Sequence, residues 1–294
     1  MSLKKQINYY RKELLYKICP ITTSKIRYYK SRKRHLNLKN PQLLSEKLMY
    51  INLYMDDLFA TDLTDKYKVR DYIKKEGYKD LLVELLGVYN SVEEINFDEL
   101  PNEFVLKCTH GCGYNIVCKN KENFNIVEAK KKLNRWMHDN YAYFNIEKHY
   151  ESIKPRIICE KYIGELDSGL PIDYKLFCIN GKVVLTQCCT DRLSGLKLAY
   201  YDLDWNQLDY SCRDIDKGLN IERPINYEEM KKVATKLSKP FDFIRVDFYE
   251  IKGKLYIGEL TFTPAACNLS YLNLEAEEKL GNILKINGEC MGKS

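Results

Sequence analysis

Two short turns in the second half of the chain constrain the fold most strongly. Asn180-Gly181 divides the β-rich run 173–187, and Asn-Gly between apolar runs is the strongest local signal for a two-residue β-hairpin turn. A second β-rich run, residues 243–261, turns through Lys252-Gly253-Lys254. Turns this short join only antiparallel strands. The chain is therefore predicted to be an α/β protein of the α+β type built on antiparallel hairpins, which excludes a doubly wound parallel sheet.

The remaining elements follow from the spacing of apolar residues. Helical spacing predicts helices within four ranges: 3–38, 45–78, 125–139 and 230–238. Short apolar runs at 104–107 and 157–163 predict strands. The 294 residues are 45% hydrophobic and 30% charged, which is typical of a soluble globular protein of one large or two modest domains.

Cysteine usage and hydropathy indicate the compartment. Eleven cysteines are present, and most lie in apolar runs such as Ile157-Ile158-Cys159. An odd number of thiols without a Cys-x-x-Cys pair favours buried free thiols in a reducing compartment over a disulfide framework or a zinc site. No apolar run approaches the ~20 residues of a membrane span, and the basic N-terminus is not followed by the apolar core of a signal peptide. We expect a cytoplasmic protein.

Positive charge is concentrated at the N-terminus. Residues 1–34 contain eleven Lys and Arg and one acid, Glu13, so this segment carries +10, whereas the other 260 residues carry −4. A basic segment of this kind indicates a surface for polyanions such as phosphate, anionic lipid or nucleic acid. The alternative is a solvated helix face without a partner.

Two carboxylates are expected to face each other across the last hairpin. Alternation puts Arg245 and Asp247 on one face of the first strand. With a three-residue turn, Asp247 lies opposite Glu259 and Arg245 opposite Thr261, whereas a two-residue turn would separate the carboxylates. Opposed like charges are destabilising, so the pair is predicted to hold a cation, and its hard oxygens suit Mg²⁺. The alternative is a solvated face neutralised by Arg245 and lysines.

Lys107 ends a predicted strand and is followed by a loop containing Gly111-Cys112-Gly113. An ammonium beside free backbone N–H groups can surround a polyphosphate. The loop is neither a Walker A motif nor a Rossmann fingerprint, and an ordinary tight turn is the alternative interpretation.

Three further charged positions are candidates for nucleotide contacts. Glu160 and Lys161 lie where an apolar run reaches Tyr162-Ile163; the backbone there could meet an adenine edge while Glu160 accepts from a ribose or amine. Lys175 is a candidate cation for phosphate. For each of these residues a surface ion pair is the alternative.

Asp202-Leu203-Asp204 resembles the Asp-x-Asp motif with which many glycosyltransferases hold a metal–nucleotide sugar. The following Trp205-Asn206 favours a turn instead.

The order of these segments resembles the ATP-grasp superfamily. Asp65-Lys66, Lys107 with its glycine loop, Glu160-Lys161, Arg245-x-Asp247 and Glu259-x-Thr261 follow one another as in that superfamily. The amino-acid sequences of three segments are similar to those of its TupA-like (teichuronopeptide biosynthesis) branch. These segments are Phe-Val-Leu-Lys-x-Thr-His-Gly at 104–111, Asp-Tyr-Lys-x-Phe-Cys at 173–178 and Gly-Glu-Leu-Thr-Phe-Thr-Pro at 258–264. The resemblance covers roughly residues 40–285.

The resemblance implies an ATP-grasp fold, with two α+β subdomains whose antiparallel sheets grip ATP. The implied organisation is a basic helical extension (1–40), a mainly helical lobe (41–100), a small subdomain with a glycine-rich lid (101–164) and a large subdomain with the metal site (165–294).

Roles follow for individual residues. Lys66 and Lys107 would hold the ATP phosphates under the Gly111-Cys112-Gly113 lid, and Arg245 would face the γ-phosphate. The remaining implied contacts are Glu160, Lys161 and Ile163 at the adenine and ribose, Lys175 at phosphate, and Asp247, Glu259 and Thr261 at Mg²⁺ (or Mn²⁺). Thr261 stands where the superfamily usually has Asn, and Cys112 where this branch often has Ser.

The resemblance also implies an activity: ATP-dependent carboxylate–amine ligation through an acylphosphate. Its setting would be capsule, exopolysaccharide or teichuronopeptide assembly, with an amino acid or peptide and a sugar acid or glycan as substrates. Residues 1–34 would suit an anionic glycan, a lipid-linked carrier or the inner membrane face, and we expect no nucleic acid partner. Two alternative hypotheses are a glycosyltransferase that uses Asp202 and Asp204, and a polyanion-binding module in which residues 1–34 act without a nucleotide.

Overall fold

The computed structural model describes residues 3–55, 58–164, 171–191, 195–216 and 219–286. Its helices are α1 (Leu3–Ile18), α2 (Pro20–Arg32), α3 (Leu44–Tyr54), α4 (Leu58–Thr64), α5 (Val69–Lys75), α6 (Ile126–Met137), α7 (Ala142–Asn145), α8 (Tyr227–Ser238) and α9 (Leu274–Ile283). Short 3₁₀ turns are η1 (Lys79–Leu81), η2 (Lys121–Asn123), η3 (Lys148–Tyr150), η4 (Asp214–Asp216) and η5 (Pro264–Cys267).

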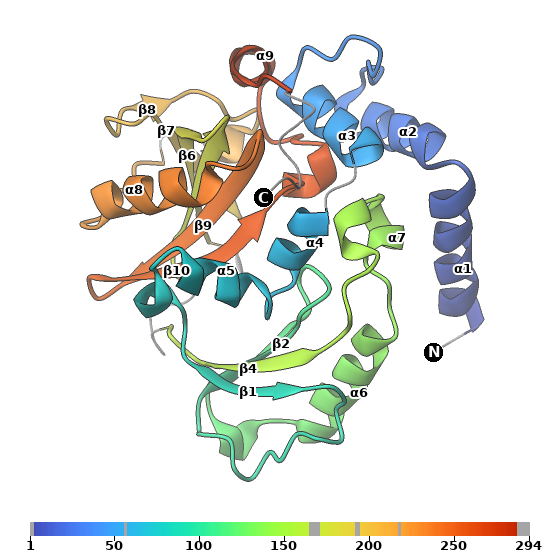
Figure 1. Cartoon of the computed structure of the whole chain (residues 1–294), viewed down its shortest axis with the longest axis vertical. Helices are drawn as coiled ribbons and strands as arrows, with labels where there is room; N and C mark the ends of the chain where they lie inside the picture. The colour runs from blue at the N-terminus through green and yellow to red at the C-terminus, as the bar shows by residue number, and fades with distance from the viewer. Residues whose placement is uncertain (1–2, 56–57, 165–170, 192–194, 217–218, 287–294) are drawn as a thin grey trace.

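The strands form two antiparallel sheets, which confirms the predicted fold class. The four-stranded sheet has the order β1-β4-β2-β3 and the six-stranded sheet the order β10-β9-β5-β6-β7-β8. Their bounds are β1 (Leu85–Tyr89), β2 (Phe104–Cys108), β3 (Asn115–Cys118), β4 (Ile157–Lys161), β5 (Asp173–Ile179), β6 (Lys182–Thr190), β7 (Lys197–Tyr201), β8 (Gln207–Leu208), β9 (Phe243–Ile251) and β10 (Lys254–Thr261). Figure 1 shows the two sheets at opposite ends of the molecule, with α4 and α5 between them.

Alternation along β2 fixes the direction of Lys107. Phe104, Leu106 and Cys108 are fully buried and form one core with Leu133 and Trp136 of α6. Because successive side chains of a strand point to opposite faces, Lys107 points away from α6 and toward the space between the sheets.

The same rule divides the six-stranded sheet. Ile244 and Val246 of β9 pack with Met230 and Leu237 of α8. Arg245, which alternates with them, faces the opposite side of the sheet, so that the buried charged residues of β9 point toward the centre of the molecule.

The predicted Asn180-Gly181 turn is confirmed, since both residues have positive φ (47° and 75°) and join β5 to β6 in the register Ile179↔Lys182. The three-residue turn predicted for the last hairpin is wrong. Ile251 pairs with Lys254, so Lys252 and Gly253 alone form the turn.

A β-bulge restores the register that this shorter turn would lose. The pairing shifts between Ile257 and Glu259, and from there Glu259 opposes Asp247 and Thr261 opposes Arg245, as predicted. The extra residue is Gly258, where a Cβ would lie 2.8 Å from Cε2 of Tyr249. A bulge shifts the register by one residue, so the two carboxylates share one face.

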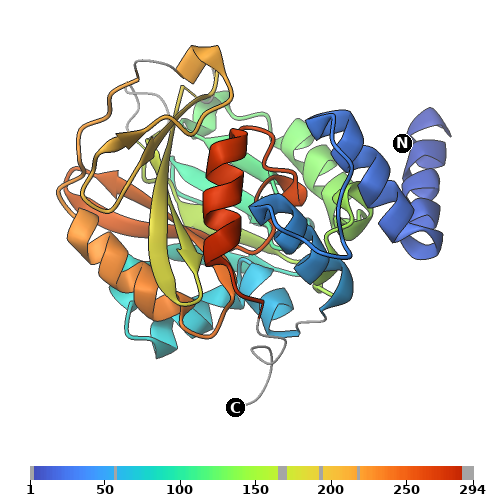
Figure 2. The same cartoon turned by 90° about the horizontal axis from the view of Figure 1, so that it is seen from above.

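The N-terminal helices are anchored to the body through α2. Arg32 donates to the carbonyl oxygens of Leu269 and Leu272, and its guanidinium lies 2.9 Å from the carboxylate of fully buried Glu277. Figure 2 shows α1 and α2 along one side of the molecule. Part of the N-terminal charge therefore has a structural use. None of the helices in the described ranges combines the length and the apolar character needed to cross a bilayer.

Candidate active site between the two sheets

A cavity of about 620 Å³ lies where the two sheets face each other. It gathers predicted residues from β2, β4, β5, β9, β10 and the loops beside them. The predicted residues that line it are Lys66, Lys107, Cys112, Gly113, Glu160, Lys175, Arg245, Glu259 and Thr261. Groups as far apart in sequence as Lys66 and Thr261 thus meet in one place.

The glycine loop joins β2 to β3 and is tied to Lys66. The Nζ of Lys66 donates to the carbonyl oxygen of Gly111 at 2.6 Å, and its backbone N–H donates to Thr109. Gly113 has φ 73°, a conformation that glycine adopts without strain. Lys66 lies in the turn before α5, so its ammonium and the loop reach the cavity together.

Glu160 lies at the centre of a buried ion-pair network. Its carboxylate accepts from Arg70 of α5 at 2.8 Å and from Lys107 of β2 at 2.6 Å. Both carboxylate oxygens of Glu160 are thus paired with protein cations, and the ribose or amine contact predicted for Glu160 stays a prediction. Arg70 also donates to the carbonyl oxygen of Val83 and was missed by the sequence reasoning, because nothing in a helical Val-Arg-Asp indicates a partner 90 residues away.

Asp247 is buried beneath the cavity and holds two cations. Arg245 donates to both its carboxylate oxygens at 2.6 and 2.7 Å, and Lys175 donates to Oδ2. Burial alone would raise the pKa of Asp247, but Arg245 and Lys175 hold that pKa below its usual range. Lys175 also lies 3.4 Å from Asp173.

Glu259 is the accessible carboxylate of the pair, with its side chain 40% exposed. Its Oε1 accepts from Thr261 at 3.3 Å and lies 3.5 Å from Nη2 of Arg245. Within the described ranges no cluster of three or more His, Cys, Asp or Glu is placed to hold a metal ion. Two opposed carboxylates and a hydroxyl fit Mg²⁺, which takes one or two protein carboxylates and completes its shell with water and phosphate.

Some predicted residues lie outside the cavity lining. Lys161 is exposed and pairs with Glu84 at 3.5 Å. Ile163 follows the end of β4 and is not among the residues that line the cavity. Gly111 does not line the cavity, but its carbonyl oxygen accepts from Nζ of Lys66, which does.

Asp202 forms a turn. Its Oδ1 accepts the backbone N–H groups of Asp204 and Asn206, and its Oδ2 accepts the side-chain amide of Asn206. This is the turn that Trp205-Asn206 favoured, and neither aspartate lines the cavity between the sheets.

Comparison with known families agrees with this geometry. The sequence profile described as TupA-like ATPgrasp matches residues 46–285. The chain belongs to the TupA-like ATP-grasp family. The family predicted from the sequence is therefore confirmed, and Arg245, Asp247, Glu259 and Lys107 all lie within the matched range.

Solved ATP-grasp structures resemble this TupA-like chain more distantly. D-alanine–D-alanine ligase from Bacillus anthracis in complex with ATP is 16% identical, with a TM-score of 0.41 over 68% of this chain and 55% of that protein. N5-carboxyaminoimidazole ribonucleotide synthetase in its ADP complex is 15% identical, with a TM-score of 0.42 over 68% and 45%. The ATP-grasp ligase PsnB with its minimal precursor is 11% identical, with a TM-score of 0.42 over 76% and 60%. The match spans about half the length of the first two enzymes, and no curated protein sequence matches the chain.

The sequence reasoning missed one side of the cavity in this TupA-like chain. Five lining residues there carry polar groups that were not predicted: Arg27, Tyr141, Asn145, Glu147 and Tyr150. Burial raises the pKa of the Glu147 carboxyl to about 7, and this carboxyl accepts from Oγ1 of Thr263 at 2.6 Å. The helices of this segment are too short to show a periodic spacing of apolar residues, so the sequence did not indicate which side chains face the cavity.

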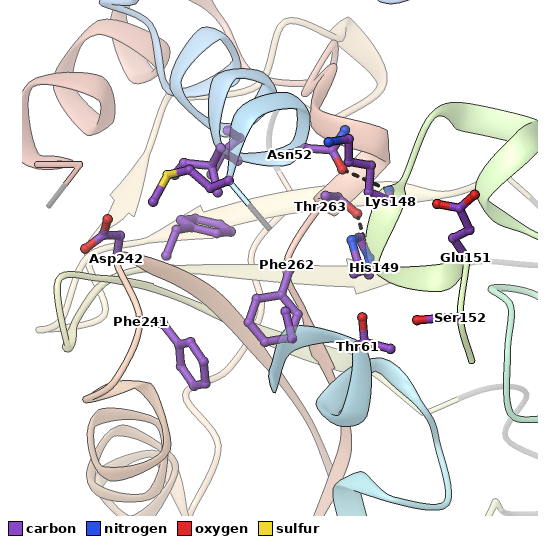
Figure 3. A pocket seen from close by; sticks show the side chains of 15 residues that line it. Asn52, Thr61, Lys148, His149, Glu151, Ser152, Phe241, Asp242, Phe262 and Thr263 are labelled. Carbon is purple, nitrogen blue, oxygen red and sulfur yellow. Dashed lines mark hydrogen bonds between the residues drawn. The ribbon is translucent and has the colours of Figure 1, made fainter. Parts of the chain in front are cut away.

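A second cavity, of about 500 Å³, adjoins the first across Thr263 (Figure 3). Oγ1 of Thr263 lies 3.3 Å from Nε2 of His149 on this side. The rings of Phe241 and Phe262 project into the cavity. The exposed surface of its walls is largely apolar, whereas charged residues of both sheets line the first cavity.

Proposed function

We propose that this chain is an ATP-dependent carboxylate–amine ligase that acts through an acylphosphate. Its proposed role is to amidate or aminoacylate a sugar acid or peptide during assembly of a cell-surface polysaccharide. The observation that carries the proposal is the joint lining of one cavity by Lys107 from one sheet and by Arg245 and Glu259 from the other. Triphosphate chemistry needs this combination of cations and metal-binding carboxylates.

The reaction has two steps. A substrate carboxylate attacks the γ-phosphorus of ATP, a P–O bond forms to the carboxylate, and the bond to the ADP oxygen breaks. A neutral amine then attacks the acyl carbon, a C–N bond forms, and phosphate leaves with the C–O electron pair while the amine loses a proton. Positioning and charge neutralisation supply most of the catalysis in such transfers.

We assign the nucleotide contacts to residues on both sheets. Lys66 and Lys107 neutralise phosphate oxygens, the Gly111-Cys112-Gly113 loop covers them, and Arg245 with Lys175 faces the transferred group. Glu160, Lys161 and Ile163 border the adenine and ribose side.

Glu259, Asp247 and Thr261 would hold Mg²⁺, or Mn²⁺ in its place. Such an ion neutralises phosphate charge and orients the γ-phosphoryl group.

A nucleotide-binding measurement tests the first assignment. Lys66→Met should weaken binding of the non-hydrolysable analogue AMPPNP with Mg²⁺ by about tenfold or more, because one charge-assisted contact to phosphate is lost. Among the described residues Lys66 has no carboxylate partner, so its removal strands no buried charge. Lys68→Met is the matched control, because Lys68 is exposed and pairs with exposed Asp62. Equal affinity in the two variants would remove Lys66 from the phosphate site.

An activity screen tests the reaction itself. Paired carboxylates (uronic acids, peptides) and amines (amino acids) are combined with Mg-ATP, ADP release is followed, and products are identified by mass spectrometry. A pair that yields ADP and an amide supports the ligase. Tight binding of UDP-sugars with no ADP release from any pair would favour the glycosyltransferase hypothesis.

We also propose that α1 attaches the enzyme peripherally to an anionic membrane, where a lipid-linked or glycan substrate would be reached. An apolar stripe on this helix is exposed to solvent: Ile7 (60%), Tyr10 (66%), Leu14 (57%) and Ile18 (72%). Basic residues surround it in the segment that carries +10. An apolar face flanked by Lys and Arg is typical of helices that lie in the interface of anionic bilayers.

Vesicle sedimentation tests this attachment. The chain should bind phosphatidylglycerol vesicles and be released by salt, and it should not bind phosphatidylcholine vesicles. Leu14→Asp should lower the partition coefficient by about tenfold, because it removes buried apolar area and adds a repelled charge. Ile225→Asp is the control, since Ile225 is 86% exposed outside the N-terminal helices. Equal partition of the two variants would contradict a role for the α1 stripe.

A further inference from the structure

One corner of the cavity between the sheets is built from the N-terminal extension and the 141–150 segment. Arg27 of α2 lines the cavity there, beside Tyr141, Glu147 and Tyr150. Arg27 lies outside the range matched by the family profile, 46–285. The corner borders the glycine loop, because a Cβ on Gly111 would lie 3.1 Å from Cδ2 of Tyr141.

Arg27 differs from most other cations that line this cavity. Lys107, Lys175 and Arg245 each lie within ion-pair distance of a carboxylate. Nη2 of Arg27 donates to neutral oxygens, the carbonyl of Phe144 and Oδ1 of Asn145, and no carboxylate lies within ion-pair distance of it among the described residues.

The guanidinium of Arg27 therefore keeps donors for a ligand. A guanidinium carries five N–H donors in a planar fork that matches a carboxylate, and within the described ranges Nε and Nη1 make no hydrogen bond. The contacts to Phe144 and Asn145 hold the side chain against α7, which lowers the entropy cost of binding an anion there.

The lining of the same cavity also includes buried oxygen acceptors. Glu147 is nearly fully buried, and its charge acts on Arg27 without a direct ion pair. Oδ1 of Asn268, which also lines the cavity, is buried and has no hydrogen-bond partner among the described residues. A buried acceptor without a partner is costly unless a ligand supplies an N–H.

We infer that this corner binds the amine-donating substrate and that this substrate is an α-amino acid. Its carboxylate lies on the Arg27 fork, and its amino group lies toward Glu147 and Asn268. A ligand with one anionic group and one N–H donor on the same carbon satisfies both halves of the corner, which a simple carboxylate or phosphate would not. This inference rests on the proposed ligase function.

The arrangement also places the amine for attack. An amino acid enters as the ammonium and passes one proton to the Glu147 carboxylate. The neutral amine then forms the C–N bond to the acyl carbon as phosphate leaves, and its second proton goes to that phosphate. The same side chains thus select the substrate and direct its nitrogen toward Glu259 and Arg245.

A ligand series on the unmodified chain tests the inference. The common amino acids, in both L and D forms, are titrated into the full chain with AMPPNP and Mg²⁺. At least one should bind, and its carboxamide and its des-amino analogue should each bind about tenfold more weakly or worse, since each loses a charge-assisted contact. Absence of binding by every amino acid, or equal binding of the acid and the amide, would overturn the inference.

Variants locate the carboxylate contact. Arg27→Gln should weaken binding of the amino acid by about tenfold or more. The same variant should bind the carboxamide of that amino acid almost as the wild type does, because the carboxamide already lacks the contact that Arg27→Gln removes. Arg27→Lys keeps the positive charge but loses the planar guanidinium, and its affinity for the amino acid should lie between those of the wild type and Arg27→Gln. Lys30→Gln, at an exposed position on the same helix, removes the same charge and should leave binding unchanged.

Binding of AMPPNP distinguishes a failure of the proposed ligase function from a failure of the proposed amino acid site. AMPPNP should bind the wild type and Arg27→Gln with equal affinity, which also reports that the variant is folded. Failure of the wild type to bind AMPPNP would count against the ligase itself. AMPPNP binding combined with an Arg27→Gln variant that binds the amino acid as the wild type does would refute the assigned corner alone.

Discussion

Glu259→Gln should abolish most of the ADP formation while leaving the fold intact. The side chain is 40% exposed and its contacts are a hydroxyl at 3.3 Å and a guanidinium at 3.5 Å, so an isosteric amide disturbs little packing. The change removes the more accessible of the two opposed carboxylates. Loss of one charge that stabilises a transition state commonly costs about a hundredfold or more in rate.

The measurement is ADP release with the substrate pair found in the screen, followed at increasing Mg²⁺. The rate of Glu259→Gln should recover in part at high Mg²⁺, because the remaining ligands bind the ion more weakly. Glu275→Gln removes an exposed acid on α9 and should act as the wild type does. An unchanged rate in Glu259→Gln would show that this carboxylate holds no catalytic metal.

Glu160→Gln should destabilise the protein strongly. The carboxylate bridges Arg70 and Lys107, and the side chains of Arg70 and Glu160 are only 9% and 8% exposed. Removing one partner of a buried ion pair typically costs about 3–5 kcal/mol, because an uncompensated charge remains. The free energy of unfolding, obtained from urea denaturation, should fall by an amount of this order.

A pair on the same sheet provides the control. Glu84 and Lys161 form an ion pair with both side chains more than 60% exposed, and such pairs contribute at most about 1 kcal/mol. Glu84→Gln should therefore leave unfolding almost unchanged. Mg²⁺ with AMPPNP should restore part of the stability lost in Glu160→Gln, since phosphate would give Lys107 a new counter-charge. Equal unfolding of the two variants would mean that Glu160 is not the centre of a buried network.

Much of the fold could be predicted from local signals. Asn180-Gly181 specified its turn because both residues tolerate positive φ. Alternation along β9 separated Arg245 and Asp247 from the apolar residues, since one face of this strand packs on α8. By contrast, β7 and β8 were not predicted.

The opposition of Asp247 and Glu259 was predicted correctly through an incorrect turn. Lys252-Gly253 forms a two-residue turn, and the bulge at Gly258 compensates for it. A glycine within a strand is compatible with a bulge, but its effect on register depends on the length of the neighbouring turn. Two local features must therefore be known together before the pairing can be derived.

The partners inside the cavity were harder to predict. Lys107, Glu160 and Arg245 were recognised because strand ends and alternation single them out. Arg70 and Arg27 lie on helices whose orientation depends on tertiary packing, and their contacts join residues 90 to 118 positions apart. No local pattern records such distances.

Arg245 and Lys175 together neutralise the buried negative charge of Asp247. Under the proposed assignment, Arg245 and Lys175 would turn toward phosphate only when another positive charge neutralises the carboxylate of Asp247. A nucleotide that binds together with its divalent ion would supply that positive charge and the phosphates at once. The nucleotide alone would leave Asp247 without a counter-charge, and the ion alone would leave Arg245 and Lys175 without one. Under the proposed assignment, the affinity of this pocket for nucleotide and its affinity for a divalent ion should therefore rise together.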